Sequence, residues 1–137
     1  MATGRCLCGA VTYEVRGPLR DVLICHCVEC RRWQGHVSAM TAAQREDLVL
    51  TEGRGLRWIR SPHSDARARR GFCGDCGSSL FWDAPGRETV SIAAGTLDGP
   101  TGLRSASHWY ASQAGDYYAM QDDGLPRHER SGEGELP

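Results

Sequence analysis

Seven cysteines are the residues of this 137-residue chain best suited to chemistry. They occur at CxC and CxxC spacings in three stretches: GRCLCG (Cys6, Cys8), ICHCVECRR (Cys25, Cys27, Cys30) and GFCGDCG (Cys73, Cys76). An odd number cannot all pair as disulfides, and the chain begins MATGRCLC without an apolar signal stretch. We therefore expect reduced thiols in the cytoplasm, where such clusters are typical ligands of Zn²⁺.

Four of the cysteines form two half-sites that could close around one metal ion. CGDCG is a tight CxxC turn followed by Gly77, and CLCG places Cys6 and Cys8 on the same side of an extended chain. Joining these two pairs, Cys6 and Cys8 with Cys73 and Cys76, gives a tetrahedral site of four thiolates. A closed site of this kind is structural.

The remaining three cysteines have no fourth thiol. Three protein ligands with one open position are typical of catalytic zinc, so Cys25, Cys27 and Cys30 are candidate catalytic ligands. Two alternatives stay open: one of the histidines His26, His36 or His108 closes the site, or the three thiols bind no metal.

The charge of a three-thiolate site narrows its chemistry. Three thiolates around Zn²⁺ leave a net negative charge, so this ion is a weaker Lewis acid than one held by neutral histidines. A sulfur-rich site is better suited to holding another thiolate for attack on an electrophile. Cys27 and Cys30 lie at the start of the expected helix, where backbone N–H groups favour the thiolate form.

The elements that must position these cysteines are mostly short strands. Apolar residues alternate with polar ones in VTYEV, residues 11–15, and in TVSIA, residues 89–93. Further strands are expected at Val37–Thr41, Leu48–Thr51, Leu56–Arg60, Arg69–Phe72, Ser79–Trp82 and His108–Ala111, and the only helix at Val28–Gln34. This pattern predicts a mainly β, sandwich-like antiparallel domain over residues 1–126, with the cysteines in turns at strand ends and a flexible tail over 127–137.

Composition excludes two classes of partner. The formal net charge is −1 and the arginines are scattered, so no concentrated cationic face for nucleic acid is expected. No apolar run approaches the ~20 residues of a membrane-spanning helix. The oligomeric state cannot be read from the sequence.

Four separated motifs carry a resemblance to a known family. GRCLCGAVTYEV, CHCVECRRWQG, GFCGDCGSSLFW and AAGTLDGP with the later SHWYAS resemble the glutathione-dependent formaldehyde-activating enzyme (GFA, CENP-V) family, in order from Gly4 to about Pro126. The resemblance implies an Mss4-like, all-β zinc fold with two zinc ions per chain. All sixteen basic residues are arginine and none is lysine, which favours a GC-rich, bacterial source. A structural zinc would lie on Cys6, Cys8, Cys73 and Cys76, and a catalytic zinc on Cys25, Cys27 and Cys30.

The implied activity is that of a carbon–sulfur lyase. The family adds the thiol of glutathione to formaldehyde and forms S-(hydroxymethyl)glutathione, so a small-molecule thiol and a small aldehyde are the implied partners. Arg31 and Arg32 could hold a peptide carboxylate, and His26 and His108 could lie beside the substrate. For His108, a buried structural histidine at a strand end is the alternative.

Three other functions are alternatives to this one. A cytidine deaminase would need a proline before its CxxC motif, and Phe72 stands there. A methionine sulfoxide reductase would need a cysteine after Cys76. The strongest rival is a non-catalytic two-zinc binding module, which would have no exchangeable fourth ligand at the three-cysteine cluster.

Overall fold

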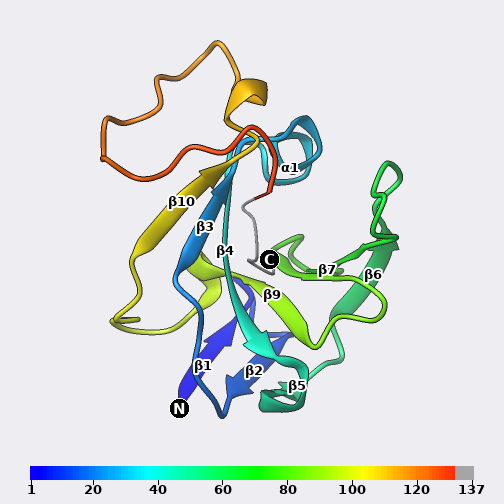
Figure 1. Ribbon diagram of the computed structural model, residues 1–137. Helices are drawn as coiled ribbons and strands as arrows, with labels where there is room; N and C mark the ends of the chain where they lie inside the picture. The colour runs from blue at the N-terminus through cyan, green and yellow to red at the C-terminus, as the bar shows by residue number, and fades with distance from the viewer. Residues whose placement is uncertain (132–137) are drawn as a thin grey trace.

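The computed structural model describes residues 1–131, and these residues form a mainly β fold with one α-helix. The described residues contain ten strands and one short α-helix, and Figure 1 shows the helix at one end of the fold, beside the ends of β3 and β4. Their bounds are β1 (Ala2–Arg5), β2 (Thr12–Val15), β3 (Val22–Cys25), α1 (Val28–Gln34), β4 (Ser38–Gln44), β5 (Leu48–Glu52), β6 (Leu56–Arg60), β7 (Arg69–Cys73), β8 (Ser79–Asp83), β9 (Thr89–Ala93) and β10 (Ser105–Trp109). Single 3₁₀ turns occur at Arg45–Asp47 (η1), Ala94–Thr96 (η2) and Ala111–Gln113 (η3). The mainly β fold class expected from the sequence is confirmed.

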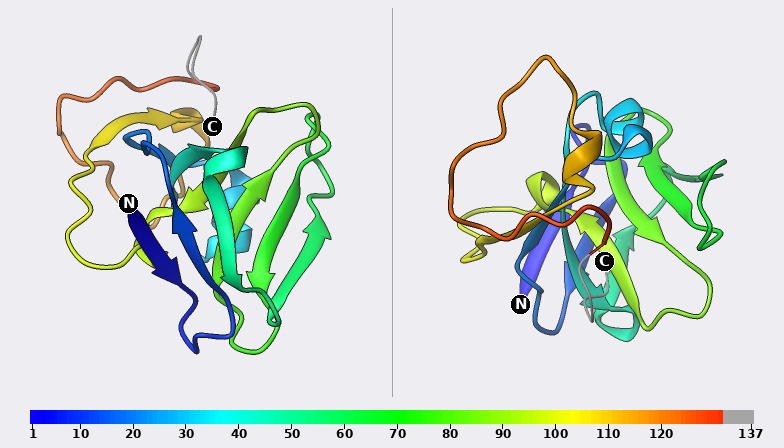
Figure 2. Two further views of the ribbon diagram at one scale, coloured as in Figure 1. Left: turned by 90° about the horizontal axis from the view of Figure 1, so that it is seen from below. Right: turned by 45° about the horizontal axis from the view of Figure 1, so that its top comes forward.

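The strands form two sheets. The smaller sheet has the order β1-β2-β5, and the larger one has the order β10-β3-β4-β9-β8-β7-β6. All neighbours are antiparallel except β10 and β3, which run parallel. In Figures 1 and 2 the larger sheet is strongly curved, and the smaller sheet packs near the N-terminus against one end of it.

The core lies between the two sheets and follows from the alternation in β2. Val11, Tyr13 and Val15 are buried, whereas the residues between them are only partly buried. The ring of Tyr13 meets Phe81 of β8 edge to face at 5.4 Å, and its hydroxyl is 2.7 Å from the Thr96 Oγ1. One tyrosine thus joins the small sheet to the large one by apolar packing and by a hydrogen bond.

The short helix α1 has defined caps at both ends. The Cys27 Sγ accepts a hydrogen bond from the backbone N–H of Cys30, and Gly35 ends the helix in the left-handed conformation with φ 79°. A sulfur at the N-cap and a glycine at the C-terminal end satisfy helix-end groups that would otherwise lack partners. These signals lie in the sequence itself, and the expected helix Val28–Gln34 is confirmed.

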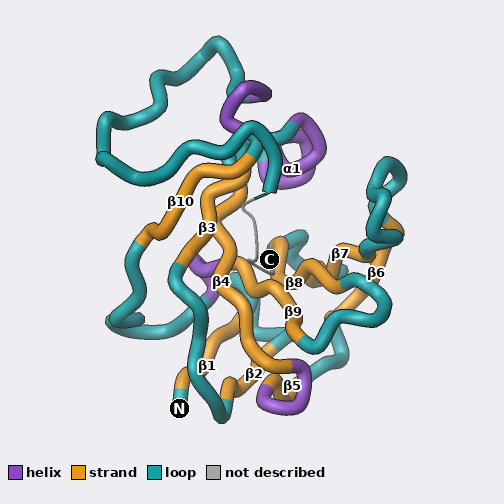
Figure 3. Tube along the Cα trace, viewed as in Figure 1, coloured by secondary structure: helices purple, strands orange, loops and turns teal. Residues whose placement is uncertain are grey.

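The strand β10 differs from the expected range His108–Ala111. It runs from Ser105 to Trp109 and stops there because Tyr110 adopts a left-handed conformation, with φ 54°. The following segment makes a long excursion beside α1, orange to red in Figure 1 and teal in Figure 3, and returns along β10. On the return, the N–H of His108 donates to the carbonyl of Pro126, and the N–H of His128 donates to the carbonyl of His108.

Residues 127–130, the beginning of the expected tail, are therefore hydrogen-bonded to the domain, and residues 132–137 lie outside the described residues. The domain boundary at residue 126 stays a prediction. Within residues 1–131, no helix combines the length and the hydropathy needed to cross a membrane.

Candidate metal centres

Two groups of cysteine side chains converge in the fold. Within each group the sulfur atoms all lie within 4.8 Å of one another, and the groups are Cys6, Cys8, Cys73 and Cys76, and Cys25, Cys27 and Cys30. These are the two sets into which the spacing sorted the seven cysteines. Both groups could hold a metal ion.

The four-cysteine group is built from two turns. Cys6 and Cys8 follow β1 in a turn closed by Gly9 with φ 85°, and Cys73 ends β7. The hairpin between β7 and β8 then turns at Gly77, with φ 80°, whose N–H donates to the carbonyl of Cys73 at 2.7 Å. Both glycines adopt left-handed conformations that a side chain would strain.

The sulfur geometry of this group fits a tetrahedral ion. A Zn–S bond of about 2.3 Å places the corners of a tetrahedron about 3.8 Å apart. The Cys6 Sγ lies 3.7 Å from the Cys8 Sγ, which lies 3.8 Å from the Cys73 Sγ. The N–H of Val11 donates to the Cys6 Sγ at 3.3 Å, and the hydrogen bond from Ser78 lowers the pKa of Cys76 to about 5. Four sulfurs at this spacing, two of them with hydrogen-bond donors, suit a closed metal site.

The three-cysteine group lies where β3 passes into α1. Cys25 is the last residue of β3, Cys27 is the N-cap of α1, and Cys30 lies in its first turn. Cys25 and Cys27 are two residues apart in a nearly extended segment, and the helical turn brings Cys30 back beside them. All three side chains are partly buried.

Hydrogen bonds among these thiols favour the thiolate form at Cys27. Hydrogen bonds from Cys25 and Cys30 lower the pKa of Cys27 to about 2, and the N–H of Cys30 and the charge of Arg70 act in the same direction. The hydrogen bonds that Cys25 makes with Cys27 and Cys30, together with burial, raise the pKa of Cys25. A divalent ion would remove this difference, because metal binding deprotonates every ligating thiol.

This group of sulfurs is in contact with a buried arginine, which the spacing of the cysteines did not predict. Arg70 of β7 is 6% exposed, and its Nη2 lies 3.8 Å from the Cys30 Sγ. Its Nε donates to the Ser61 Oγ at 3.1 Å, and that hydroxyl donates in turn to the Glu29 carboxylate on α1. The chain therefore supplies a fixed positive charge beside three sulfurs.

His26 and His108, the two histidines expected near the substrate, are hydrogen-bonded to each other. The His26 Nε2 lies 2.8 Å from the His108 Nδ1, and both residues are buried. The outer nitrogens are also occupied, His26 Nδ1 by the hydroxyl of Tyr118 at 2.6 Å and His108 Nε2 by Asp123 at 2.7 Å. Burial, followed by the charge of His108, lowers the pKa of His26.

This arrangement bears on the fourth ligand of the three-cysteine group. Within residues 1–131, no histidine nitrogen, and no carboxylate, joins the group of sulfurs within 4.8 Å. His36, the third candidate, is exposed and its Nδ1 lies 2.8 Å from the hydroxyl of Tyr117. The described part of the chain thus brings three ligands to this site.

The two arginines expected at the substrate lie on α1 with different surroundings. Arg31 donates through its Nε to the backbone carbonyl of His26 at 3.3 Å, whereas Arg32 is exposed. Their role in substrate binding, like that of His26 and His108, stays a prediction. Tyr110, which the sequence did not single out, lies close enough to Cys25 and Cys27 that, after burial, their charges raise its pKa.

Comparison with known proteins adds a family and a fold. The model of the family described as "Glutathione-dependent formaldehyde-activating enzyme" matches residues 1–113. Among solved structures, the crystal structure of a Rhodobacter sphaeroides protein matches with a TM-score of 0.57 and 28% identity, over 75% of this chain and 97% of that one. The comparison with curated proteins gives no match.

Proposed function

The chain belongs to the glutathione-dependent formaldehyde-activating enzyme family, and from this premise we propose that it is a zinc-dependent carbon–sulfur lyase. Its substrates are a small-molecule thiol of the glutathione type and formaldehyde or a related small aldehyde. The catalytic ligands are Cys25, Cys27 and Cys30, and the structural ligands are Cys6, Cys8, Cys73 and Cys76. Because both sets must stay reduced, we place the reaction in the cytoplasm.

One observation carries the proposal: three sulfurs converge within 4.8 Å, and among the described residues no histidine, carboxylate or further thiol joins them as a fourth donor. When bound there, a zinc ion supplies a fourth coordination position that accepts a substrate sulfur as thiolate. The protein keeps this position available because the ring nitrogens of His26 and His108 are engaged with each other and with Tyr118 and Asp123.

The residues around the cluster reduce the cost of gathering negative charge. Three thiolates exceed the charge of a divalent ion by one, and an incoming thiolate raises the excess to two. Arg70, at 3.8 Å from the Cys30 Sγ, offsets part of this excess, and the N–H of Cys30 donates to the Cys27 Sγ at 3.3 Å. The site therefore favours a sulfur nucleophile over an activated water.

The reaction balances without an oxidant or a reductant. The thiol loses its proton, its sulfur forms a bond to the aldehyde carbon, and the π electrons of the carbonyl move to oxygen, which takes up a proton. The product is a thiohemiacetal, S-(hydroxymethyl)glutathione for glutathione and formaldehyde, and the reverse reaction releases both substrates. In this proposal Arg31 and Arg32 of α1 bind the peptide carboxylate of the thiol substrate.

Cobalt substitution tests the proposal, because absorption from sulfur to Co²⁺ reports the number of thiolate ligands. Titration of the cobalt protein with glutathione is expected to increase this absorption as a fourth sulfur binds, with tighter binding as pH rises toward the pKa of the thiol. The Cys27→Ser variant is expected to lose the increase. If no cellular thiol adds a fourth sulfur, the lyase is excluded and a non-catalytic two-zinc binding module takes its place.

A further inference from the structure

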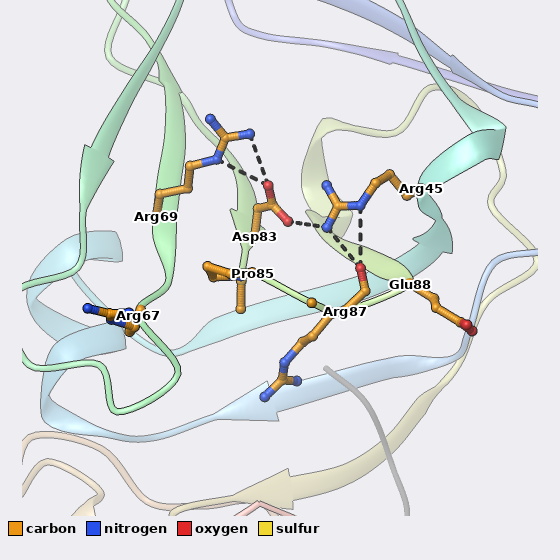
Figure 4. A pocket seen from close by; sticks show the side chains of 9 residues that line it. Arg45, Arg67, Arg69, Asp83, Pro85, Arg87 and Glu88 are labelled. Carbon is orange, nitrogen blue, oxygen red and sulfur yellow. Dashed lines mark hydrogen bonds and ion pairs between the residues drawn. The ribbon is translucent and has the colours of Figure 1, made fainter.

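A hollow of about 550 Å³, whose lining contains no cysteine, opens where β7 begins and β8 ends. Figure 4 shows it between the start of β7 and the turn that follows β8. Its charged lining consists of four arginines and two carboxylates: Arg45, Arg67, Arg69, Arg87, Asp83 and Glu88. The lyase proposed above uses none of these residues.

Two of the arginines are held in place by one buried carboxylate. The side chain of Asp83 is 8% exposed, and its Oδ1 accepts from the Arg45 Nη2 at 2.6 Å. Its Oδ2 accepts from Arg69 through Nε at 3.1 Å and Nη2 at 3.0 Å, and the guanidinium of Arg69 lies 3.8 Å above the ring of Trp58. The single charge of Asp83 neutralises only one of these two fixed cations.

The other two arginines have features that a purely structural role does not explain. The guanidinium of Arg87 lies 5.0 Å from the ring centre of Trp82, and its Nη1 is buried without a hydrogen-bond partner in the described part of the chain. A buried unpaired N–H group is costly, and because this nitrogen is closed to solvent, the Arg87 side chain would have to shift toward the hollow for a ligand to complete it. Arg67 has φ 57°, a left-handed conformation that is uncommon for a residue other than glycine and that concentrates at functional sites.

The charge balance points to the class of ligand. Four guanidinium groups and two carboxylates leave two positive charges, and the exposed Glu88 turns away from the guanidinium groups in Figure 4. We propose that this pocket binds a small dianion, a phosphate monoester or a dicarboxylate, through Arg67 and Arg87 beside the fixed pair Arg45 and Arg69. Guanidinium groups bind phosphate and carboxylate through paired, charge-assisted hydrogen bonds.

Calorimetric titration of the full chain tests this proposal. At about pH 8, where phosphate is mainly dianionic, we expect inorganic phosphate or succinate to bind at least about 10-fold more tightly than acetate at equal ionic strength. Tighter binding of phosphate would assign phosphate monoesters, and tighter binding of succinate would assign dicarboxylates. Equal affinity for acetate and for both dianions would overturn the proposal.

Variants separate a built site from general attraction to a basic protein. We expect Arg87→Gln and Arg67→Gly each to weaken dianion binding about 10-fold, and glycine at 67 suits the left-handed backbone, so folding is retained. The matched control is Arg16→Gln, which removes the same charge from a side chain that is 60% exposed, after β2. An equal loss in Arg16→Gln, or unchanged binding in Arg87→Gln and Arg67→Gly, would refute a site at this pocket.

Discussion

Replacing Arg70 by methionine removes the positive charge beside the three-cysteine cluster and keeps a side chain of similar length. The charge lies 3.8 Å from the Cys30 Sγ, and two unit charges at this separation interact by about 4 kcal/mol at an effective dielectric constant near 20. Burial of Arg70, which is 6% exposed, offsets part of this energy. Half of the interaction, about 2 kcal/mol, corresponds to about a 30-fold loss of metal affinity at this cluster.

Competition with a chromophoric chelator measures this loss, because it resolves the affinities of the two clusters in one titration. We expect Arg70→Met to weaken only the three-cysteine site, and Arg70→Lys to restore part of the affinity. Arg16→Met, which removes a charge from an exposed arginine, is the control. If Arg70→Met binds metal at the three-cysteine cluster as tightly as the unmodified protein, the electrostatic role argued for Arg70 is wrong.

Three further predictions concern stability and metal retention. Mild chelation is expected to remove one metal first while circular dichroism shows the fold intact. Cys73→Ser is expected to lower the folded yield, whereas Cys27→Ser is expected mainly to affect thiol binding. Simultaneous loss of both metals with unfolding would show that both sites are structural. Burial would raise the pKa of Asp83, but the hydrogen bonds and charges of its two arginine partners outweigh it and lower the pKa, so Asp83→Asn is expected to cost about 2 kcal/mol at neutral pH in urea unfolding. The difference in unfolding free energy between the protein and Asp83→Asn should shrink as the pH falls below about 4, the ordinary pKa of an aspartate, and through the lower pKa of Asp83 in the folded state. A difference that does not change with pH would contradict this prediction. A Cβ at Gly55 would lie 2.7 Å from the Cβ of Ala10 and 3.0 Å from the Cys73 Sγ, so Gly55→Ala is expected to destabilise the protein by about 1 to 3 kcal/mol and to release metal, and an unchanged melting temperature would count against this packing.

The local parts of the structure could be predicted because their signals lie within a few residues. The helix α1 begins at a sulfur cap and ends at Gly35, and the sequence shows both. β1, with the sequence ATGR, contains no alternation of apolar residues, and β3, VLIC, is an apolar run of four residues with no period. Neither strand was singled out, because the pairing with neighbouring strands, and not an internal pattern, determines them.

The site shows the same division between local and distant contacts. The spacing of the cysteines sorted them into the two groups that the fold assembles. Arg70 reaches Cys30 across 40 residues, and Asp123 reaches His108 across 15, through the curvature of a sheet and the course of a loop. No spacing rule encodes such contacts, so the charge beside the cluster became visible only in three dimensions.

The two cysteine clusters differ in when they can form as the chain folds. The three-cysteine cluster lies within six consecutive residues and needs only the turn from β3 into α1, which forms quickly. The four-cysteine cluster joins Cys8 to Cys73 across 65 residues, so it requires β1, β7 and the β7–β8 hairpin to be in place. A metal cross-link over this span removes about 4 kcal/mol of chain entropy from the unfolded state. The three-cysteine cluster can therefore bind metal before the rest of the chain has folded, whereas the four-cysteine cluster binds metal only after its strands have assembled and then stabilises that arrangement.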